Sequence, residues 1–235
     1  MPADFGSVMS ANSSFFIYIA LIIALPLLAQ FKVKSAFAKY SKVRAQNNMP
    51  GAQVARKILD DNGLHHVQIE MTSTKLGDHY DPRKKVIRLS EENFHHPSIA
   101  AAAIAAHECG HAIQDDEGYA FLKFRSALVP VASLGSNLSW FILIAGLLLN
   151  MAGLILVGII FMAFAVLFQL VTLPVEFNAS SRAMDQVVSL GIIQYDEEKS
   201  ARKVLNAAAM TYVAAAAVAV LELMRFILIF LNRRD

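Results

Sequence analysis

Residues 107–111 of the chain, H-E-C-G-H, could bind a metal ion and use it for hydrolysis. In an α-helix, side chains at positions i and i+4 lie on the same face, so the imidazoles of His107 and His111 can bind one ion. Glu108 points to a different face, from which it can hold a water molecule beside that ion. This HExxH arrangement is typical of zinc hydrolases. We therefore predict one Zn²⁺ ion with His107 and His111 as ligands and Glu108 as the catalytic base.

A helix must present these residues, and the sequence from Ser98 to Gln114 predicts one. The segment is rich in alanine and free of proline, and Ser98 is a typical N-cap residue. The alternative is a polar helix end with two surface histidines, but the apolar alanine stretch before His107 argues against it. Cys109 is the only cysteine and lies on another face of the helix than the two histidines, so we interpret it as a packing residue rather than a ligand.

A catalytic zinc site needs three protein ligands and one open position, so a third ligand must come from elsewhere. The best candidate is Glu176, in the segment P-V-E-F-N-A-S-S-R-A that begins at Pro174. We expect Pro174 to begin a helix and Glu176 to lie in its first turn, where it could instead only stabilise the helix N-terminus. The competing carboxylates are Asp115, Asp116, Glu117, Asp185 and Glu222.

The composition predicts an integral membrane protein. Of 235 residues, 56% are hydrophobic and only 17% are charged, and the mean hydropathy is +0.46. The net charge of +2 and the lack of a recognisable binding motif argue against a nucleic-acid partner. We expect a lipid bilayer and a polypeptide substrate as partners, together with a membrane protein partner or a second copy of the chain.

Four segments are long and apolar enough to cross a bilayer: residues 14–31, 127–149, 152–173 and 207–231. The basic residues that follow the first segment place the N-terminus outside and residues 32–126 and 174–206 in the cytoplasm. Arg233 and Arg234 conflict with an external C-terminus, but the earlier flanks carry more charge. In the last span, Glu222 and Arg225 could neutralise each other on one helix face.

This topology divides the chain into five parts: residues 1–31, 32–126, 127–173, 174–206 and 207–235. Within the second part we predict a helix over residues 50–62 and strands over residues 66–72 and 85–90, separated by a turn-rich segment. The strand just before the zinc helix is well placed to pair with an extended peptide substrate. The alternative is an ordinary hairpin that covers the helix.

The motifs together resemble the YugP-type neutral zinc metallopeptidases, which are related to HtpX-like and CAAX-processing membrane peptidases. They are G-D-H-Y-D-P at 77–82, V-I-R-L-S, A-A-H-E-C-G-H-A-I-Q and P-V-E-F-N-A-S-S-R-A. The resemblance implies a mainly α integral membrane protein, with about four transmembrane helices and a small α+β gluzincin-like catalytic unit. It also implies a bacterial inner membrane location and a site that faces the cytoplasm.

The resemblance supports Glu176 as the third ligand, through the E-x-x-A-[DS] pattern of such peptidases. HtpX-like members carry an aspartate after the alanine, whereas this chain has Ser180. The hydrogen-bond partner expected for a histidine ligand is therefore an open question.

The predicted function is that of a zinc-dependent endopeptidase acting on membrane or membrane-proximal proteins. Glu108 would take a proton from the attacking water and deliver it to the leaving amine. His79, Tyr80 and Arg182 are candidates to stabilise the oxyanion, and each could equally be a turn residue or a surface charge. The alternative is a non-proteolytic zinc-containing membrane scaffold or chaperone-like protein. A transporter is disfavoured, because few charged residues lie within the predicted spans.

Overall fold

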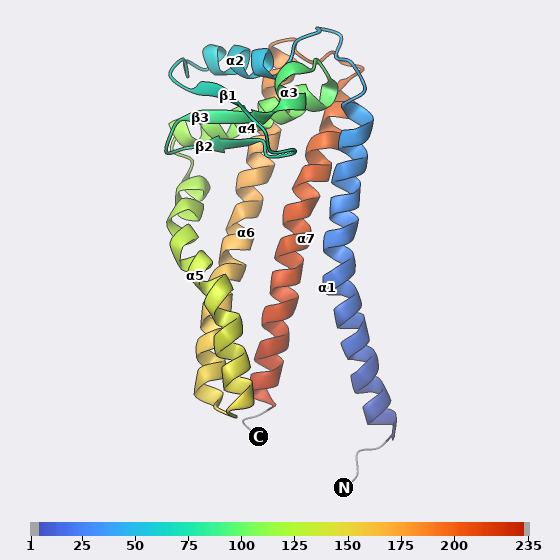
Figure 1. Cartoon of the computed structure of the whole chain (residues 1–235), viewed down its shortest axis with the longest axis vertical. Coiled ribbons are helices and arrows are strands. Elements are labelled where there is room, and N and C mark those ends of the chain that lie inside the picture. The colour runs from blue at the N-terminus through green and yellow to red at the C-terminus, as the bar shows by residue number, and fades with distance from the viewer. Residues whose placement is uncertain (1–4, 233–235) are drawn as a thin grey trace. The chain divides into compact units, whose positions relative to one another are not determined.

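The computed structural model describes residues 5–232, and their side chains from residue 15 onward. The chain folds into two compact units. The apolar unit comprises residues 1–30, 128–170 and 211–235, and the HExxH unit comprises residues 31–127 and 171–210. Each of the long helices contributes residues to both units, so the chain passes between them several times (Figure 1).

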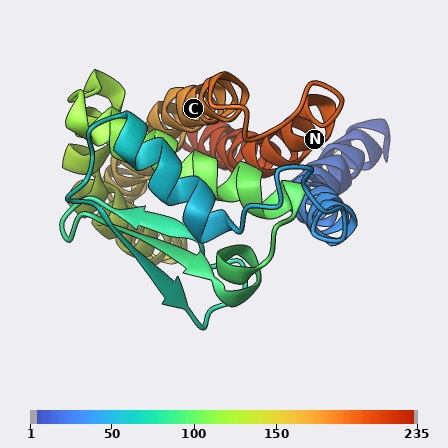
Figure 2. The ribbon, with the colours of Figure 1, turned by 90° about the horizontal axis from the view of Figure 1, so that it is seen from above.

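The HExxH unit contains three short helices and all three strands of the described residues. The helices are α2 (Gly51–Asp61), α3 (Glu91–His95) and α4 (Ile99–Asp116), and the strands are β1 (Gln68–Thr72), β2 (His79–Asp81) and β3 (Val86–Ser90). Figure 2 shows α2 and the strands beside α4. The helix predicted from Ser98 to Gln114 is confirmed, because α4 begins after Ser98, whose side chain accepts a hydrogen bond from the backbone N–H of Ala101 at 3.1 Å.

The alanine-rich helix α4 forms the centre of this unit. Most of its residues are buried, as expected for a helix that is apolar on nearly all sides. Branched side chains from α2 and β3 pack around it, including Ile58, Leu59, Ile87 and Leu89, all of which are fully buried. Small side chains on α4 therefore let its neighbours approach its backbone closely.

The sheet has the order β1-β3-β2, in which β1 is parallel and β2 antiparallel to β3. The two predicted strands are confirmed, but the hairpin alternative is wrong, because these strands pair in parallel. The strand β2 was missed, since the sequence around it is rich in turn residues. The Asp78 carboxylate secures this segment by accepting hydrogen bonds from Ser90 N at 2.7 Å and Asn93 Nδ2 at 3.0 Å.

The position of β3 also corrects the expectation about substrate pairing. Both of its edges are already hydrogen-bonded, one to β1 and the other to β2. The strand just before the zinc helix therefore has no free edge for an extended peptide. The free edges of the sheet belong to β1 and β2.

Four helices are long and apolar enough to cross a membrane: α1 (Phe5–Tyr40), α5 (Ala120–Leu148), α6 (Ala152–Ser189) and α7 (Glu198–Leu231). To that extent the four predicted spans are confirmed. Asn150 adopts a positive φ of 54° in the turn between α5 and α6, which lies between the second and third predicted spans. Within the apolar unit, Trp140 of α5 contacts Phe226 of α7 edge to face, with ring centroids 5.5 Å apart.

One sequence expectation about these helices is wrong, and the expected neutralisation of Glu222 by Arg225 is met only in part, because Arg225 acts on Glu222 through its charge and not in an ion pair. Pro174 does not begin a helix, because α6 continues through it to Ser189, so Glu176 is not in a first turn. A proline removes one backbone hydrogen bond, and long apolar helices tolerate this loss, as α1 and α5 also do.

Glu222 and Arg225 do not form an ion pair among the described residues. The Arg225 guanidinium lies instead over the ring of Tyr18, 4.6 Å from its centroid.

Candidate metal centre

One potential ligand atom from each of His107, His111 and Glu176 lies within 4.8 Å of the other two. The Oε2 atom of Glu176 is 3.3 Å from Nε2 of His107 and 3.6 Å from Nε2 of His111. The two imidazole rings are nearly perpendicular, with centroids 4.7 Å apart. Two nitrogens and one oxygen thus converge on one point, and this donor set suits a catalytic zinc ion.

The glycine within H-E-C-G-H brings α4 and α6 together. A Cβ atom at Gly110 would lie 2.6 Å from the carbonyl oxygen of Ala179, which is closer than any side chain permits. The two backbones are therefore nearly in contact at this point. Glu176 lies about one turn before Ala179 on α6, so this contact places its carboxylate beside the two histidines of α4.

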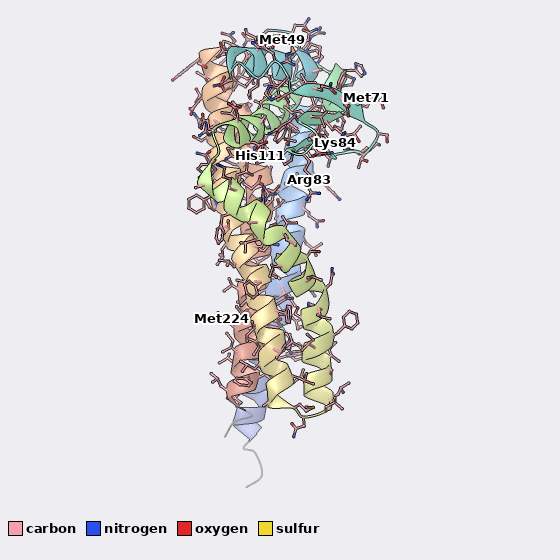
Figure 3. All side chains as sticks on the ribbon, turned by 90° about the vertical axis from the view of Figure 1, so that its left-hand side faces the viewer. Met49, Met71, Arg83, Lys84, His111 and Met224 are labelled. Atoms are coloured by element: carbon pink, nitrogen blue, oxygen red, sulfur yellow. The ribbon has the colours of Figure 1, made fainter. Side chains whose placement is uncertain are left out.

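Gln114 fixes the orientation of the His111 ring and determines which ring nitrogen carries the proton. His111 is labelled in Figure 3. The side chain of Gln114 is fully buried, and its Nε2 donates hydrogen bonds to the carbonyl of Val175 and to Oδ1 of Asn178, both at 2.9 Å. Its Oε1 must then accept, and it lies 3.0 Å from Nδ1 of His111. The proton of neutral His111 is therefore on Nδ1, which leaves the Nε2 lone pair directed at the metal position.

Ser180 plays the corresponding part for His107. Its Oγ lies 3.2 Å from Nδ1 of His107 and can accept the ring proton, so that Nε2 carries the lone pair. The hydroxyl occupies the place in the pattern where HtpX-like members have an aspartate. The structure therefore supplies the hydrogen-bond partner that the sequence left open.

Arg125 contacts the oxygen of Glu176 that faces away from the histidines. Its Nη1 lies 3.3 Å from Oε1, and the Glu176 side chain is only 2% exposed. A buried carboxylate needs such partners, and here each oxygen has one. The sequence does not single out Arg125, since nothing in its local sequence distinguishes it from other arginines.

The remaining residues of the motif are also buried. Glu108 is 7% exposed. The thiol of Cys109 is fully buried and donates to the carbonyl of Ala55 at 3.6 Å, and this burial raises its pKa well above the ordinary value. Both facts fit a packing residue, and Cys109 is not part of the triad. Burial alone would lower the pKa of His111, but hydrogen bonding to Glu176 and the nearby Glu108 charge raise it.

Two of the competing carboxylates have other partners. Asp115 accepts hydrogen bonds from the Tyr80 hydroxyl at 2.8 Å and from Lys85 Nζ at 2.7 Å, which ties the end of α4 to the sheet. Glu117 pairs with Arg182 at 2.7 Å. Among the described residues, the group that could hold a metal does not include Asp116, Asp185 or Glu222 either.

The structure does not bring the three oxyanion candidates into contact with the triad. Nδ1 of His79 is 2.7 Å from the carbonyl of Gly77. The hydroxyl of Tyr80 donates a hydrogen bond to Asp115, and burial together with this hydrogen bond raises the pKa of the phenol. Nε of Arg182 donates to Asn178 at 2.8 Å, so Arg182 supports the Gln114 network. A direct oxyanion role for these three residues stays a prediction.

Comparison with known proteins identifies the family of the chain. A family described as "Putative neutral zinc metallopeptidase" matches residues 15–231. The chain is also similar to the "Putative membrane protease YugP" of Bacillus subtilis (strain 168), with 50% identity over 221 residues, or 94% of this chain and 98% of that protein. No solved structure matches. The family resemblance predicted from the motifs is confirmed.

Proposed function

Because the chain belongs to the family of neutral zinc metallopeptidases, we propose that it is a zinc-dependent membrane endopeptidase that cleaves membrane or membrane-proximal proteins. The observation that carries this proposal is the convergence of His107, His111 and Glu176 around one point, with Glu108 on the same helix. Two imidazoles and one carboxylate leave a fourth position open, as a hydrolytic zinc site requires.

The residues of the chain have distinct tasks in this mechanism. A zinc ion held by the triad supplies an activated water and polarises the scissile carbonyl. Glu108 takes the proton from the attacking water and passes it to the leaving amine, which would otherwise depart as an unstable anion. Gln114 and Ser180 keep the Nδ1 protons of the two histidines in place, so that both Nε2 atoms remain available as ligands.

We infer that the substrate main chain pairs with the free edge of β2. This strand contacts α4 and is joined to it through the hydrogen bond from Tyr80 to Asp115. Pairing with an edge strand binds a peptide in an extended conformation through its main chain. Binding therefore does not depend on the peptide's side chains, which suits an enzyme that cleaves many sequences.

We further propose that the enzyme is a multi-pass inner-membrane protein whose site faces the cytoplasm. Four long apolar helices support membrane insertion, and the basic residues that follow the first apolar segment support the orientation. Cysteine labelling of residues in β2 and in the α5–α6 turn, in intact cells and in inverted vesicles, would test it. Labelling of β2 from outside the intact cell would contradict the orientation.

Zinc content and cleavage of casein and of membrane-protein substrates test the proposed activity. We expect the purified wild type to bind one zinc ion and to cleave, and Glu108→Gln to keep the zinc while kcat falls by about 10²–10⁴-fold. Asp116→Asn is the matched control, because Asp116 is an exposed acid on the same helix, and both properties should persist. A wild type that holds zinc but cleaves no polypeptide, or an active Glu108→Gln variant, would contradict the peptidase.

A further inference from the structure

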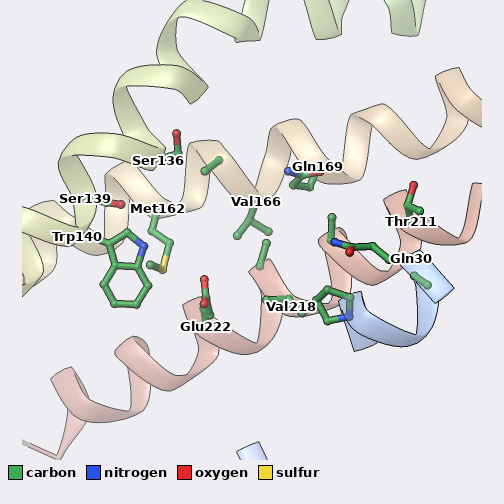
Figure 4. A pocket seen from close by; sticks show the side chains of 15 residues that line it. Gln30, Ser136, Ser139, Trp140, Met162, Val166, Gln169, Thr211, Val218 and Glu222 are labelled. Atoms are coloured by element: carbon green, nitrogen blue, oxygen red, sulfur yellow. The ribbon is translucent and has the colours of Figure 1, made fainter. Parts of the chain in front are cut away.

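The apolar unit contains a cavity of about 420 Å³ between α1, α5, α6 and α7 (Figure 4). Its walls are mostly apolar, but polar side chains from all four helices reach it. These include Gln30, Ser139, Gln169, Thr211 and Glu222. A cavity of this size is typical of ligand sites in general, and polar lining inside an apolar helical unit is unusual.

The carboxyl group of Glu222 is directed into this cavity (Figure 4). Among the described residues it forms no hydrogen bond and no ion pair. The nearest basic residue along α7, Arg225, lies over the rings of Phe15 and Tyr18 on α1, at 5.0 and 4.6 Å from their centroids. Glu222 therefore presents its carboxyl group to the cavity without a hydrogen-bond or salt-bridge partner among the described residues, and Arg225 acts on it only through its charge.

The depth of Glu222 limits what can approach it. It lies well inside α7, roughly 13 Å before the end of the helix at Leu231, given a rise of about 1.5 Å per residue. Lipid headgroups remain at the bilayer surface, since the hydrocarbon core is about 30 Å thick. A positive group at this depth is therefore more readily supplied by a side chain within another transmembrane segment.

We propose that this cavity recognises a Lys or Arg side chain within a transmembrane segment of the polypeptide substrate. The inference rests on the proposed peptidase and names its substrate class. A helix is about 10–12 Å wide and does not fit into the cavity, whereas a single long basic side chain does. The substrate helix therefore lies outside the cavity and extends one side chain into it, where Glu222 neutralises the charge in a medium of low dielectric constant.

The wall contributed by α1 provides the entrance. Pro26, Ala29 and Gln30 line the cavity from this helix. Only 6% of the residues in the apolar part of α1 are buried, against 28%, 33% and 17% in the apolar parts of α5, α6 and α7. The helix that closes the cavity on this side is thus the least tightly packed of the four and can yield to an incoming side chain.

The test measures peptide binding to the full-length chain in lipid nanodiscs, with Glu108→Gln present to prevent cleavage. The probes are synthetic transmembrane peptides with a leucine core and Lys, Leu or Glu at the depth of Glu222. We expect the Lys peptide to bind at least about 10-fold more tightly than the Leu peptide, as one neutralised charge in this medium allows. We expect the Glu peptide to bind most weakly.

Variants at position 222 make the test specific. Glu222→Gln should remove the preference for Lys, and Glu222→Lys should reverse it in favour of the Glu peptide. Met224→Gln is the control, because Met224 is 55% exposed on the same helix, and the preference should remain (Figure 3). Reversal of the preference cannot arise from loss of folding alone.

Equal binding of the three peptides to the parent protein would overturn the inference, as would a Lys preference that survives Glu222→Gln. A phospholipid that native mass spectrometry finds retained through Glu222, without any peptide preference, would also overturn it. Zinc content and casein cleavage of the protein with Glu108 intact separate the two proposals. If both are normal and the peptides bind equally, only the substrate inference fails; if both are absent, the peptidase itself fails.

Discussion

Glu176 and Glu222 are both carboxyl groups on long apolar helices, and their surroundings differ in kind. Glu176 is 2% exposed, with Arg125 at one oxygen and two imidazoles at the other. Glu222 is partly exposed to a cavity and has no hydrogen-bond or ion-pair partner among the described residues. Each lies in a different unit of the molecule.

The difference shows that a carboxyl group in an apolar environment can serve either to bind a metal or to recognise a charged ligand. In the HExxH unit, the surrounding hydrogen bonds fix every donor and acceptor before a metal arrives, so little has to be reorganised when it binds. In the apolar unit, the missing partner is itself the recognition element, because a charge in this medium favours a ligand that neutralises it.

Removing the carboxylate of Glu176 should weaken zinc binding, whereas removing that of Glu222 should not. Glu176→Gln replaces a ligand oxygen by a neutral amide, and we expect zinc affinity to fall by more than about 100-fold, beyond the effect of altering a supporting residue. Glu222→Gln should leave zinc affinity unchanged. Competition with a chromophoric chelator measures both. Equal losses in the two variants would show that the carboxyl groups do not have separate tasks.

Gly110→Ala tests whether the close approach of α4 and α6 builds the triad. The added Cβ would meet the Ala179 carbonyl at 2.6 Å, so the helices must separate, and we expect a loss of about 1–3 kcal/mol in stability. Zinc affinity should fall with it. Gly153→Ala is the matched control, since a Cβ there has no atom within 4 Å. Thermal unfolding that is equally affected in both variants would contradict the role of Gly110.

Gln114→Met tests the fixed orientation of His111. Methionine fills a similar volume but accepts no proton from Nδ1 and leaves Asn178 without its donor. We expect zinc affinity to fall by about 10–100-fold while the fold persists. Circular dichroism tests whether the fold persists, and competition with a chelator measures the zinc affinity. An unchanged affinity would mean that packing alone orients the imidazole.

The pair of Glu117 and Arg182 should give the smallest effect. Hydrogen bonding to Arg182 lowers the pKa of Glu117, so its contribution to stability is present above the unfolded pKa and is lost as the pH falls through the folded pKa. Glu117 is largely exposed, which limits the contribution to about 0.5 kcal/mol. Glu117→Gln should therefore lower the unfolding temperature slightly at pH 7, and this difference should shrink as the pH is lowered. A difference that grows on acidification would contradict this sign.

The local features of the chain could be predicted from its sequence. The spacing of His107 and His111 fixes their common face, because helix periodicity is a property of the backbone. Ser98 caps the helix through atoms only three residues away. The four apolar segments are visible because a bilayer demands uninterrupted hydrophobic length. Glu176 could be proposed because a zinc site needs a third ligand.

The contacts between distant segments were decided only by the tertiary structure. Arg125 contacts Glu176, 51 positions away in the sequence, and nothing local marks it. Ser180 contacts His107, 73 positions away, and its place in the pattern after Glu176 did not show that its hydroxyl would be the partner of His107. The continuation of α6 through Pro174 and the pairing of β2 with β3 likewise override local preferences. Packing can outweigh one lost hydrogen bond or a turn-rich composition, since the free energy of burial is summed over many contacts that a sequence pattern does not contain.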